Sequence, residues 1–165
     1  MAASATAKTG RAPDARRQFT FFLSKYDPAV AREARRSLAK LRQQVPNAVE
    51  LVYDNYNALV VGFCPGLRPS EAILSLAVMP RWVTLCFLQG KGLPDPERRL
   101  RGAGNVVRNV RLEDGAKTLD QPAIRALIRE ALLRARVPIP AGQKRQFLVQ
   151  SVSRKQRPRR PSAKP

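Results

Sequence analysis

Histidine is absent from this 165-residue chain, and its absence narrows the possible chemistry more than any other feature. Histidine is the usual base in Ser-His and Cys-His catalysis and the commonest transition-metal ligand. Acidic residues are also few, 12 against 31 Lys and Arg, and no Asp or Glu pair has a metal-ligand spacing. These absences argue against most hydrolytic and metal-dependent enzymes. They predict a non-enzymatic protein that holds neither a metal nor another cofactor.

Cysteine is almost as scarce, since Cys64 and Cys86 are the two in the chain. Two thiols do not make a disulfide framework in a chain of this length, so we expect a reducing, cytoplasmic location. Each thiol reads as a small apolar residue of a strand, because the sequence supplies no base to activate it. No long apolar run exists either: residues 72–88 are interrupted by Pro80-Arg81, which predicts that no segment crosses a membrane.

Positive charge is abundant, and it is concentrated at the two ends. The net charge is +19, and residues 137–165 contain eight Lys and Arg and no acidic residue. Such an excess attracts nucleic acid or another polyanion without sequence preference, through the release of counterions. The alternative is that the basic ends are simply solvated. The residues predicted to contact a polyanion are Arg154, Lys155, Arg157, Arg159 and Arg160.

The chain divides into a central domain and two basic ends. Residues 1–18 lack hydrophobic periodicity, which predicts a disordered leader. The domain is expected at 19–137 and a proline-rich tail at 138–165, in which residues 147–152 could form a short strand. A helix is predicted over 28–44, where Asp27 and Pro28 are typical start residues and Pro46 ends the pattern.

Five strands and a closing helix are predicted after this first helix. Two hairpins are expected, one from residues 49–53 and 58–63 and one from 72–79 and 82–88, followed by a strand at 105–112. Asp120 is expected to cap the closing helix. Because strands are grouped between helices without alternation, we predict a two-layer α+β fold. An antiparallel sheet of about five strands would carry the N- and C-terminal helices on one face.

Two charged residues within predicted strands suggest a ligand cleft. Glu50 and Arg108 each lie among apolar neighbours, and a buried charge is costly unless it is paired. We therefore predict that the two lie close together, with Tyr53, Tyr56 and Trp82 lining a cleft for a small polar or anionic ligand. The alternatives are a purely structural ion pair or exposure on the open face of the sheet.

Several short motifs together identify a family resemblance across residues 20–135. They are Tyr26-Asp27-Pro28, the stretch 46–56 with Glu50-Leu-Val-Tyr53-Asp-Asn-Tyr56, Gly62-Phe63, Pro69-Ser-Glu-Ala-Ile73, Leu93-Pro-Asp-Pro96 and Gly102-Ala-Gly104 with Val107-Arg108. With these motifs the chain resembles the YdhG-like domain, a bacterial family of unknown function. The ending 151–160 is similar to the tails of some members.

The resemblance implies a frataxin-like fold, with helices packed on one face of an antiparallel sheet. Some relatives are described as iron chaperones, which makes iron handling the alternative function. Frataxins display a carboxylate-rich helix, whereas the helix predicted here carries five Lys and Arg and Glu33 alone. Iron binding by this chain would need its sparse acids Glu50, Asp54 or Glu71. The favoured prediction is a non-enzymatic binding protein for a small polar ligand or a polyanion.

Overall fold

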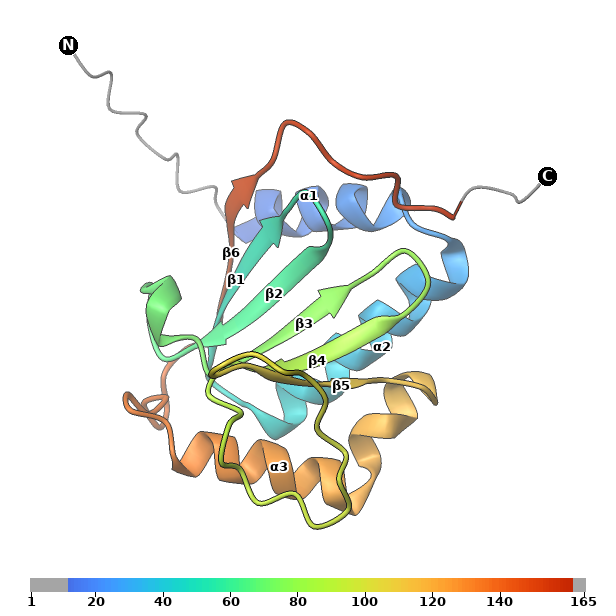
Figure 1. The fold of residues 1–165 in the computed structure, drawn as a ribbon. Helices are drawn as coiled ribbons and strands as arrows, with labels where there is room; N and C mark the ends of the chain where they lie inside the picture. The colour runs from blue at the N-terminus through green and yellow to red at the C-terminus, as the bar shows by residue number, and fades with distance from the viewer. Residues whose placement is uncertain (1–11, 162–165) are drawn as a thin grey trace.

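The computed structural model describes residues 12–161, with side chains from Asp14 onward. Along this part of the chain the α-helices, strands and short 3₁₀ helices follow in the order α1 (Ala12–Ser24), α2 (Pro28–Gln44), β1 (Val49–Asp54), β2 (Leu59–Cys64), η1 (Pro69–Glu71), β3 (Leu74–Val78), β4 (Val83–Phe87), β5 (Arg108–Arg111), η2 (Gly115–Asp120), α3 (Pro122–Leu133) and β6 (Gln146–Val152) (Figure 1). The fold is α+β, as predicted.

The strands form one sheet in the order β5-β4-β3-β2-β1-β6 (Figure 1). Strands β1 to β5 pair antiparallel with their neighbours. Strand β6 pairs parallel with β1, so the sheet is mixed and has six strands. This corrects the expected antiparallel sheet of about five. A parallel neighbour needs a long connection, and here the connection from β1 to β6 contains the other four strands and α3.

Alternating apolar residues fix the register of the β3–β4 hairpin. Leu74 lies opposite Phe87, and Leu76 lies opposite Leu85. All four side chains are fully or almost fully buried and belong to the main hydrophobic core. Because a shift of one residue would turn this whole set toward the other face, the pattern determines the pairing. The hairpin predicted from residues 72–79 and 82–88 is confirmed.

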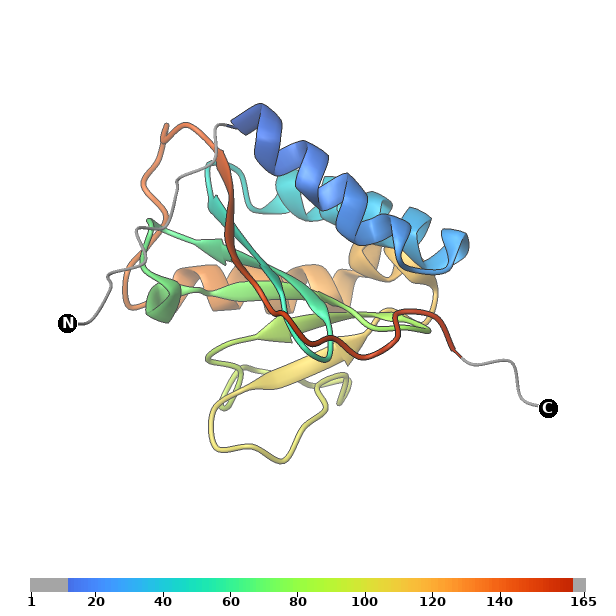
Figure 2. The same cartoon turned by 90° about the horizontal axis from the view of Figure 1, so that it is seen from above.

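Helices α1 and α2 lie side by side on one face of the sheet (Figure 2). Their buried residues share one core with the buried residues of α3 and with the sheet residues of the same face. Helix α2 has the predicted bounds, with Asp27 before its first turn and Pro28 as its first residue. A second, smaller apolar cluster of Val49, Leu51 and Cys64 lies on the opposite side of β1 and β2.

Helix α1 corrects the expectation of disorder for residues 12–18; residues 1–11 lie outside the described part of the chain. Its buried residues Ala15, Phe19, Phe22 and Leu23 recur at helical spacing and enter the main core. The ring of Phe19 meets that of Phe147 on β6 edge to face, with centroids 5.3 Å apart. Helix α1 therefore packs against β6.

Two further boundaries differ from the sequence prediction. Strand β5 begins at Arg108 instead of residue 105. The backbone bends at residues 104–106, and its pairing with β4 begins only after this bend. Helix α3 begins at Pro122 with Gln121 before it, since Asp120 belongs to the preceding 3₁₀ turn η2. No helix in residues 12–161 combines the length and apolar character needed to cross a bilayer.

Candidate functional site

The structure separates the two charged residues that were predicted to form a pair. Glu50 lies on β1 and Arg108 on β5, with β2, β3 and β4 between these strands. Four strand spacings correspond to about 19 Å across the sheet. The Arg108 guanidinium instead donates hydrogen bonds to the backbone carbonyls of Gly104 and Val107 in its own loop. The predicted Glu50–Arg108 pair is therefore wrong.

Glu50 is fully buried and is neutralised by arginines from α2 and from the residue that precedes β6. The Nε of Arg42 lies 3.0 Å from both carboxylate oxygens, and its Nη2 lies 2.8 Å from Oε1. Arg145 approaches the second oxygen at 3.6 Å. The guanidinium of Arg42 also lies over the ring of Phe147, 5.4 Å from its centroid. This arrangement ties α2 and β6 to β1, which gives Glu50 a structural role.

The three aromatic residues of the predicted cleft lie in different places. Tyr53 is half-buried beside the small apolar cluster on the sheet face opposite the helices. Tyr56 lies in the β1–β2 turn, where the guanidinium of Arg157 is 5.7 Å from its ring centroid. Trp82 lies in the β3–β4 turn, beside Arg111 of β5. The structure thus does not bring the five predicted residues into one cleft.

A second buried carboxylate, Asp54 at the end of β1, holds the segment that follows β6. Residues 153–160, which we term the C-terminal latch, pass over the β1–β2 turn toward the α1–α2 connection (Figure 1). Arg159 is 4% exposed, and its Nη2 donates to Asp54 Oδ1 at 2.8 Å. Lys25 reaches the other oxygen of Asp54 at 2.9 Å. The predicted solvated tail is thus a docked segment, and Arg159 is not free to contact a polyanion.

Further contacts of Arg159, and the neighbouring Tyr26, complete this network. Arg159 also donates to the carbonyls of Asn55 and Tyr56, and its guanidinium lies 5.6 Å from the ring centroid of Tyr26. The Tyr26 hydroxyl donates to the Val78 carbonyl and accepts from a backbone N–H. Burial raises the pKa of Tyr26, and the nearby Arg159 opposes that rise. The contacts of Arg159 hold the latch in place, and both carboxylate oxygens of the buried Asp54 are engaged by protein cations.

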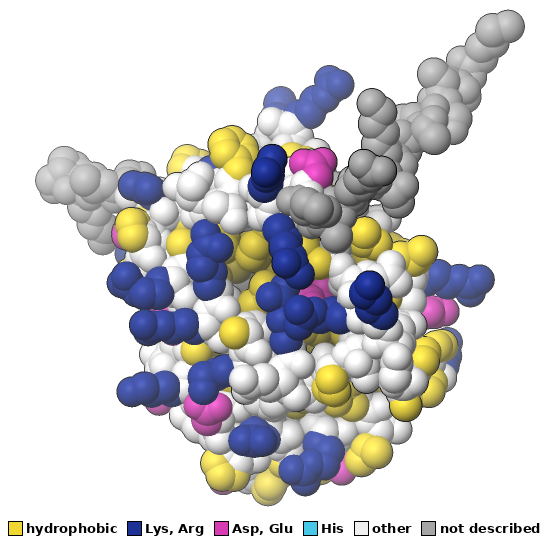
Figure 3. Space-filling view, turned by 180° about the vertical axis from the view of Figure 1, so that it is seen from behind, with side chains coloured by type: hydrophobic (Ala, Val, Ile, Leu, Met, Phe, Trp, Pro, Cys, Tyr) yellow, Lys and Arg dark blue, Asp and Glu magenta, His cyan; other side chains and the backbone are white. Residues whose placement is uncertain are grey.

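Several exposed arginines line a groove between α2 and the latch. It has a volume of about 540 Å³, and its lining residues are Leu23, Ser24, Tyr26, Pro28, Ala31, Arg32, Arg35, Arg36 and Arg160. We call this the arginine groove. Four of its nine lining residues are arginines and none is acidic. The helix-covered side of the molecule shows far more Lys and Arg than acidic side chains (Figure 3).

The arginines of the groove are largely free of protein partners. Arg36 pairs with Glu33 at 3.2 Å, and Arg160 makes a long hydrogen bond to the Ser24 carbonyl. Arg32 and Arg35 have no ion pair or side-chain hydrogen bond within residues 12–161. Their spacing on α2 places them on one helical face, which the sequence did predict to be basic. The contribution of Arg160 depends on the docked latch, which the sequence did not reveal.

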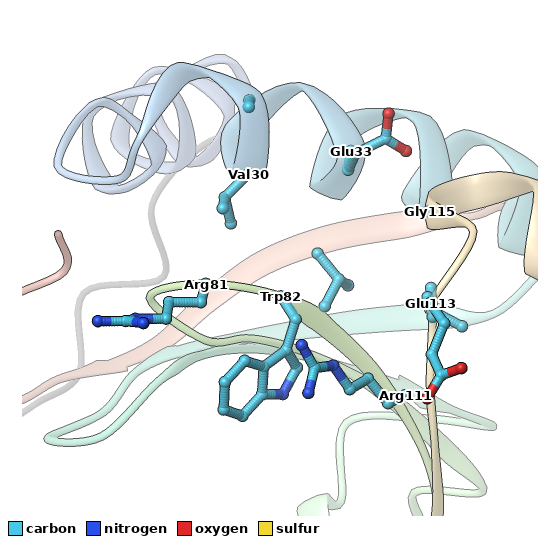
Figure 4. A pocket seen from close by; sticks show the side chains of 10 residues that line it. Val30, Glu33, Arg81, Trp82, Arg111, Glu113 and Gly115 are labelled. Carbon is cyan, nitrogen blue, oxygen red and sulfur yellow. The ribbon is translucent and has the colours of Figure 1, made fainter. Parts of the chain in front are cut away.

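A separate pocket lies at the opposite end of the β3–β4 hairpin from the loop after β4. It has a volume of about 480 Å³ and lies between the first turns of α2, the β3–β4 turn and the end of β5 (Figure 4). We call it the Trp82 pocket. The guanidinium of Arg111 lies over the Trp82 indole, 4.2 Å from its ring centroid (Figure 4). Trp82, a member of the predicted cleft, therefore lines this pocket, and its partner there is Arg111.

Groups able to ligate a metal do not gather in the part of the chain that the structure describes. No three Asp, Glu or Cys side chains there lie close enough to hold one ion. Of the acids considered for iron, Glu50 and Asp54 are fully buried in ion pairs, and Glu71 lies 3.7 Å from Arg68. Burial raises the pKa of the Cys64 thiol to about 11, so it is neutral at physiological pH.

Comparison with known proteins adds nothing to this geometry. No family model, curated protein or solved structure matches the chain.

Proposed function

We propose that the chain is a non-enzymatic, cytoplasmic binding protein for polyanions, with the arginine groove as its main contact surface. The observation that carries the proposal is the lining of this groove, in which Arg32, Arg35, Arg36 and Arg160 occur without any acidic residue. Nucleic acid is the polyanion that this surface fits best, because guanidinium groups bind phosphate oxygens in a bidentate geometry. The absence of histidine and the scattered acids support a binding role over catalysis.

Uncompensated charge supplies the driving force for binding. Arginines that lie together on one helix face repel each other, and water and counterions screen that repulsion only in part. A phosphate backbone replaces those counterions, and their release favours the complex at low salt. Because this attraction acts on phosphates and not on base edges, we expect binding to be weak, independent of sequence and strongly dependent on salt.

The C-terminal latch extends the basic surface beyond the groove. Arg154, Lys155, Arg157 and Arg160 are exposed, whereas Arg159 is buried and paired with Asp54. The first four are therefore the tail residues that we assign to polyanion contact. Deleting the whole tail would also remove Arg159 and destabilise the fold, so single side chains are the better targets.

The finer fold assignment forms part of the same proposal. The packing of α1, α2 and α3 against one face of the sheet supports a frataxin-like, YdhG-like domain. The parallel strand β6 and the latch would then be additions at the edge of that domain.

Salt-dependent binding of a labelled oligonucleotide tests the proposal. Fluorescence anisotropy with single-stranded DNA should show affinity that falls steeply with salt concentration. The double variant Arg32→Gln/Arg35→Gln should weaken binding and reduce the slope of log K against log salt by about 1.4, for two lost phosphate contacts. Arg36 is left unchanged because it pairs with Glu33, whose carboxylate accepts the Ala116 N–H.

The matched control is Arg125→Gln/Arg129→Gln on α3. These arginines are also exposed, lie four residues apart and have no ion pair in the described part of the chain. Both double variants lower the net charge equally. Equal losses of affinity in the two variants would mean that net charge alone attracts DNA, and the assignment to the groove would be wrong.

A further inference from the structure

The Trp82 pocket is distinct from the arginine groove, because the two share no lining residue. Its apolar lining includes Val30 of α2, Val83 of β4 and Leu112, which follows β5. Val83 and Leu112 are almost fully buried, so their side chains form a fixed floor. A volume of about 480 Å³ lies in the range of small-molecule sites, roughly 300–1,000 Å³.

Arg111 is held in position at the pocket without using its hydrogen-bond donors. Its guanidinium stacks on the indole of Trp82 with 4.2 Å between the charge centre and the ring centroid (Figure 4). Within residues 12–161 this guanidinium makes no hydrogen bond and no ion pair. Because stacking already restrains the side chain, the arginine loses less conformational entropy when it binds a ligand. Its planar set of N–H donors remains available to an anion.

A charged cleft, lined by four arginines and three acidic residues, adjoins the pocket and shares Arg111 and Glu113 with it. The cleft has a volume of about 270 Å³ and includes Arg98 and Arg101. Neither of these arginines has a side-chain partner in the described part of the chain, whereas neighbouring Arg99 is bound by Glu97 and Gln121. Three uncommitted guanidinium groups, those of Arg98, Arg101 and Arg111, therefore line one continuous surface.

Among the acidic residues that line the cleft, Glu113 has a carboxylate free to accept a hydrogen bond, whereas Glu97 pairs with Arg99 and Asp114 accepts from Gln121. Its carboxylate has no ion pair or side-chain hydrogen bond within residues 12–161, and it lines both the pocket and the cleft. The other acid of the pocket, Glu33, is already engaged by Arg36 and by the Ala116 N–H. A ligand at this surface therefore meets cationic donors, one free carboxylate acceptor and an apolar floor.

We propose that the Trp82 pocket and the adjoining cleft bind a nucleoside monophosphate. The flat base lies against the apolar floor beside Trp82, the phosphate binds the guanidinium of Arg111, and the ribose or an exocyclic amino group donates to Glu113. Arg98 and Arg101 add positive potential on the phosphate side. The chemistry that selects this class is the combination of an anion and a flat ring, which neither phosphate nor a nucleoside alone supplies.

Trp82 is the chain's single tryptophan, so its fluorescence reports on this pocket directly. Titration with AMP, adenosine and inorganic phosphate, at about 0.15 M salt to suppress nonspecific binding, separates the contributions. AMP should quench the fluorescence saturably, with a Kd at least about tenfold below that of adenosine or of phosphate. Arg111→Gln should weaken AMP binding by about tenfold and leave adenosine binding nearly unchanged.

Two further variants test whether AMP binds at the Trp82 pocket. Arg32→Gln/Arg35→Gln should leave the AMP titration unchanged, because these arginines belong to the other groove. Trp82→Leu, followed by calorimetry because it removes the fluorophore, should weaken both AMP and adenosine. Circular dichroism confirms that each variant is folded.

Three results would overturn the proposal. One is the absence of saturable AMP binding up to about 10 mM, which is weaker than the affinity that two such contacts provide. Another is equal affinity for AMP and phosphate, which would mean an anion site without a ring site. The third is unchanged AMP binding in Arg111→Gln. Loss of DNA binding in the groove variant, with AMP binding intact, would separate the two sites.

Discussion

Replacing Arg159 by methionine removes one charge from the chain and breaks the C-terminal latch. Methionine retains an unbranched apolar side chain, so the loss falls mainly on the guanidinium contacts. Asp54 would lose its 2.8 Å partner but keep Lys25 at 2.9 Å. The Asn55 carbonyl would lose its donor as well, whereas the Tyr56 carbonyl would keep the backbone N–H of Arg157.

The expected cost follows from burial. Arg159 is 4% exposed and Asp54 is fully buried, so water cannot readily replace the lost partner. Removing one partner of a buried ion pair costs about 3–5 kcal/mol, and because Lys25 still neutralises Asp54 we expect the lower end, about 3 kcal/mol. For a chain of this size that corresponds to a fall in Tm of about 10 °C.

Urea unfolding at pH 7, followed by circular dichroism, measures this difference. The control is Arg160→Met, the neighbouring exposed residue, which should change the free energy of unfolding by less than about 0.5 kcal/mol. The double variant Arg159→Met/Asp54→Asn should be more stable than the sum of the single losses predicts, because the two partners of the ion pair are removed together. A loss below about 1 kcal/mol in Arg159→Met would refute the reasoning and mean that the latch is not bound as the structure describes.

Two other predictions follow from the remaining buried groups. Glu50→Gln should lower the free energy of unfolding by about 1–2 kcal/mol in urea denaturation, because Arg42 loses a carboxylate partner but remains partly hydrated. Arg108→Ala removes contacts only to loop carbonyls and should cost less; the reverse order would contradict the structural role of Glu50. At pH 8 a small alkylating reagent should modify Cys86 before Cys64, as measured by mass spectrometry. Burial raises the pKa of both thiols, but Cys86 is partly exposed whereas Cys64 is fully buried and has a pKa of about 11. Faster labelling of Cys64 would contradict the structure.

The features predicted from sequence are those determined by local patterns. The bounds of α2 follow from Asp27, Pro28 and the apolar residues at helical spacing, which act within a few residues of each other. The β3–β4 pairing follows from strict alternation of apolar residues, so it too is a local property. The spacing of Ala15 and Phe19 is also typical of a helix and could have predicted α1. The charged and small residues that precede them made this short pattern hard to recognise.

The features that were missed depend on contacts between distant residues. Arg159 is one of eight Lys and Arg in residues 137–165, and nothing adjacent to it in sequence distinguishes it from Arg160. Only the path of β6 beside β1 brings it to Asp54. The partner of Glu50 was missed for the same reason, because Arg42 reaches it from α2 and not from a strand. Burial of a charge was predictable at Glu50, whereas the identity of the counter-charge was not.

The parallel pairing of β6 with β1 has a consequence for the order in which the chain folds. Hairpins β1–β2 and β3–β4 close over short loops, whereas Asp54 and Arg159 are 105 residues apart. Contacts between distant residues close slowly, so the outer edge of β1 is expected to be the last to be covered. Until then its backbone groups are open to pairing with another chain, and Asp54 stays hydrated at little cost. Refolding yield should therefore fall with protein concentration, and the edge of β1 is the surface through which partly folded chains would associate.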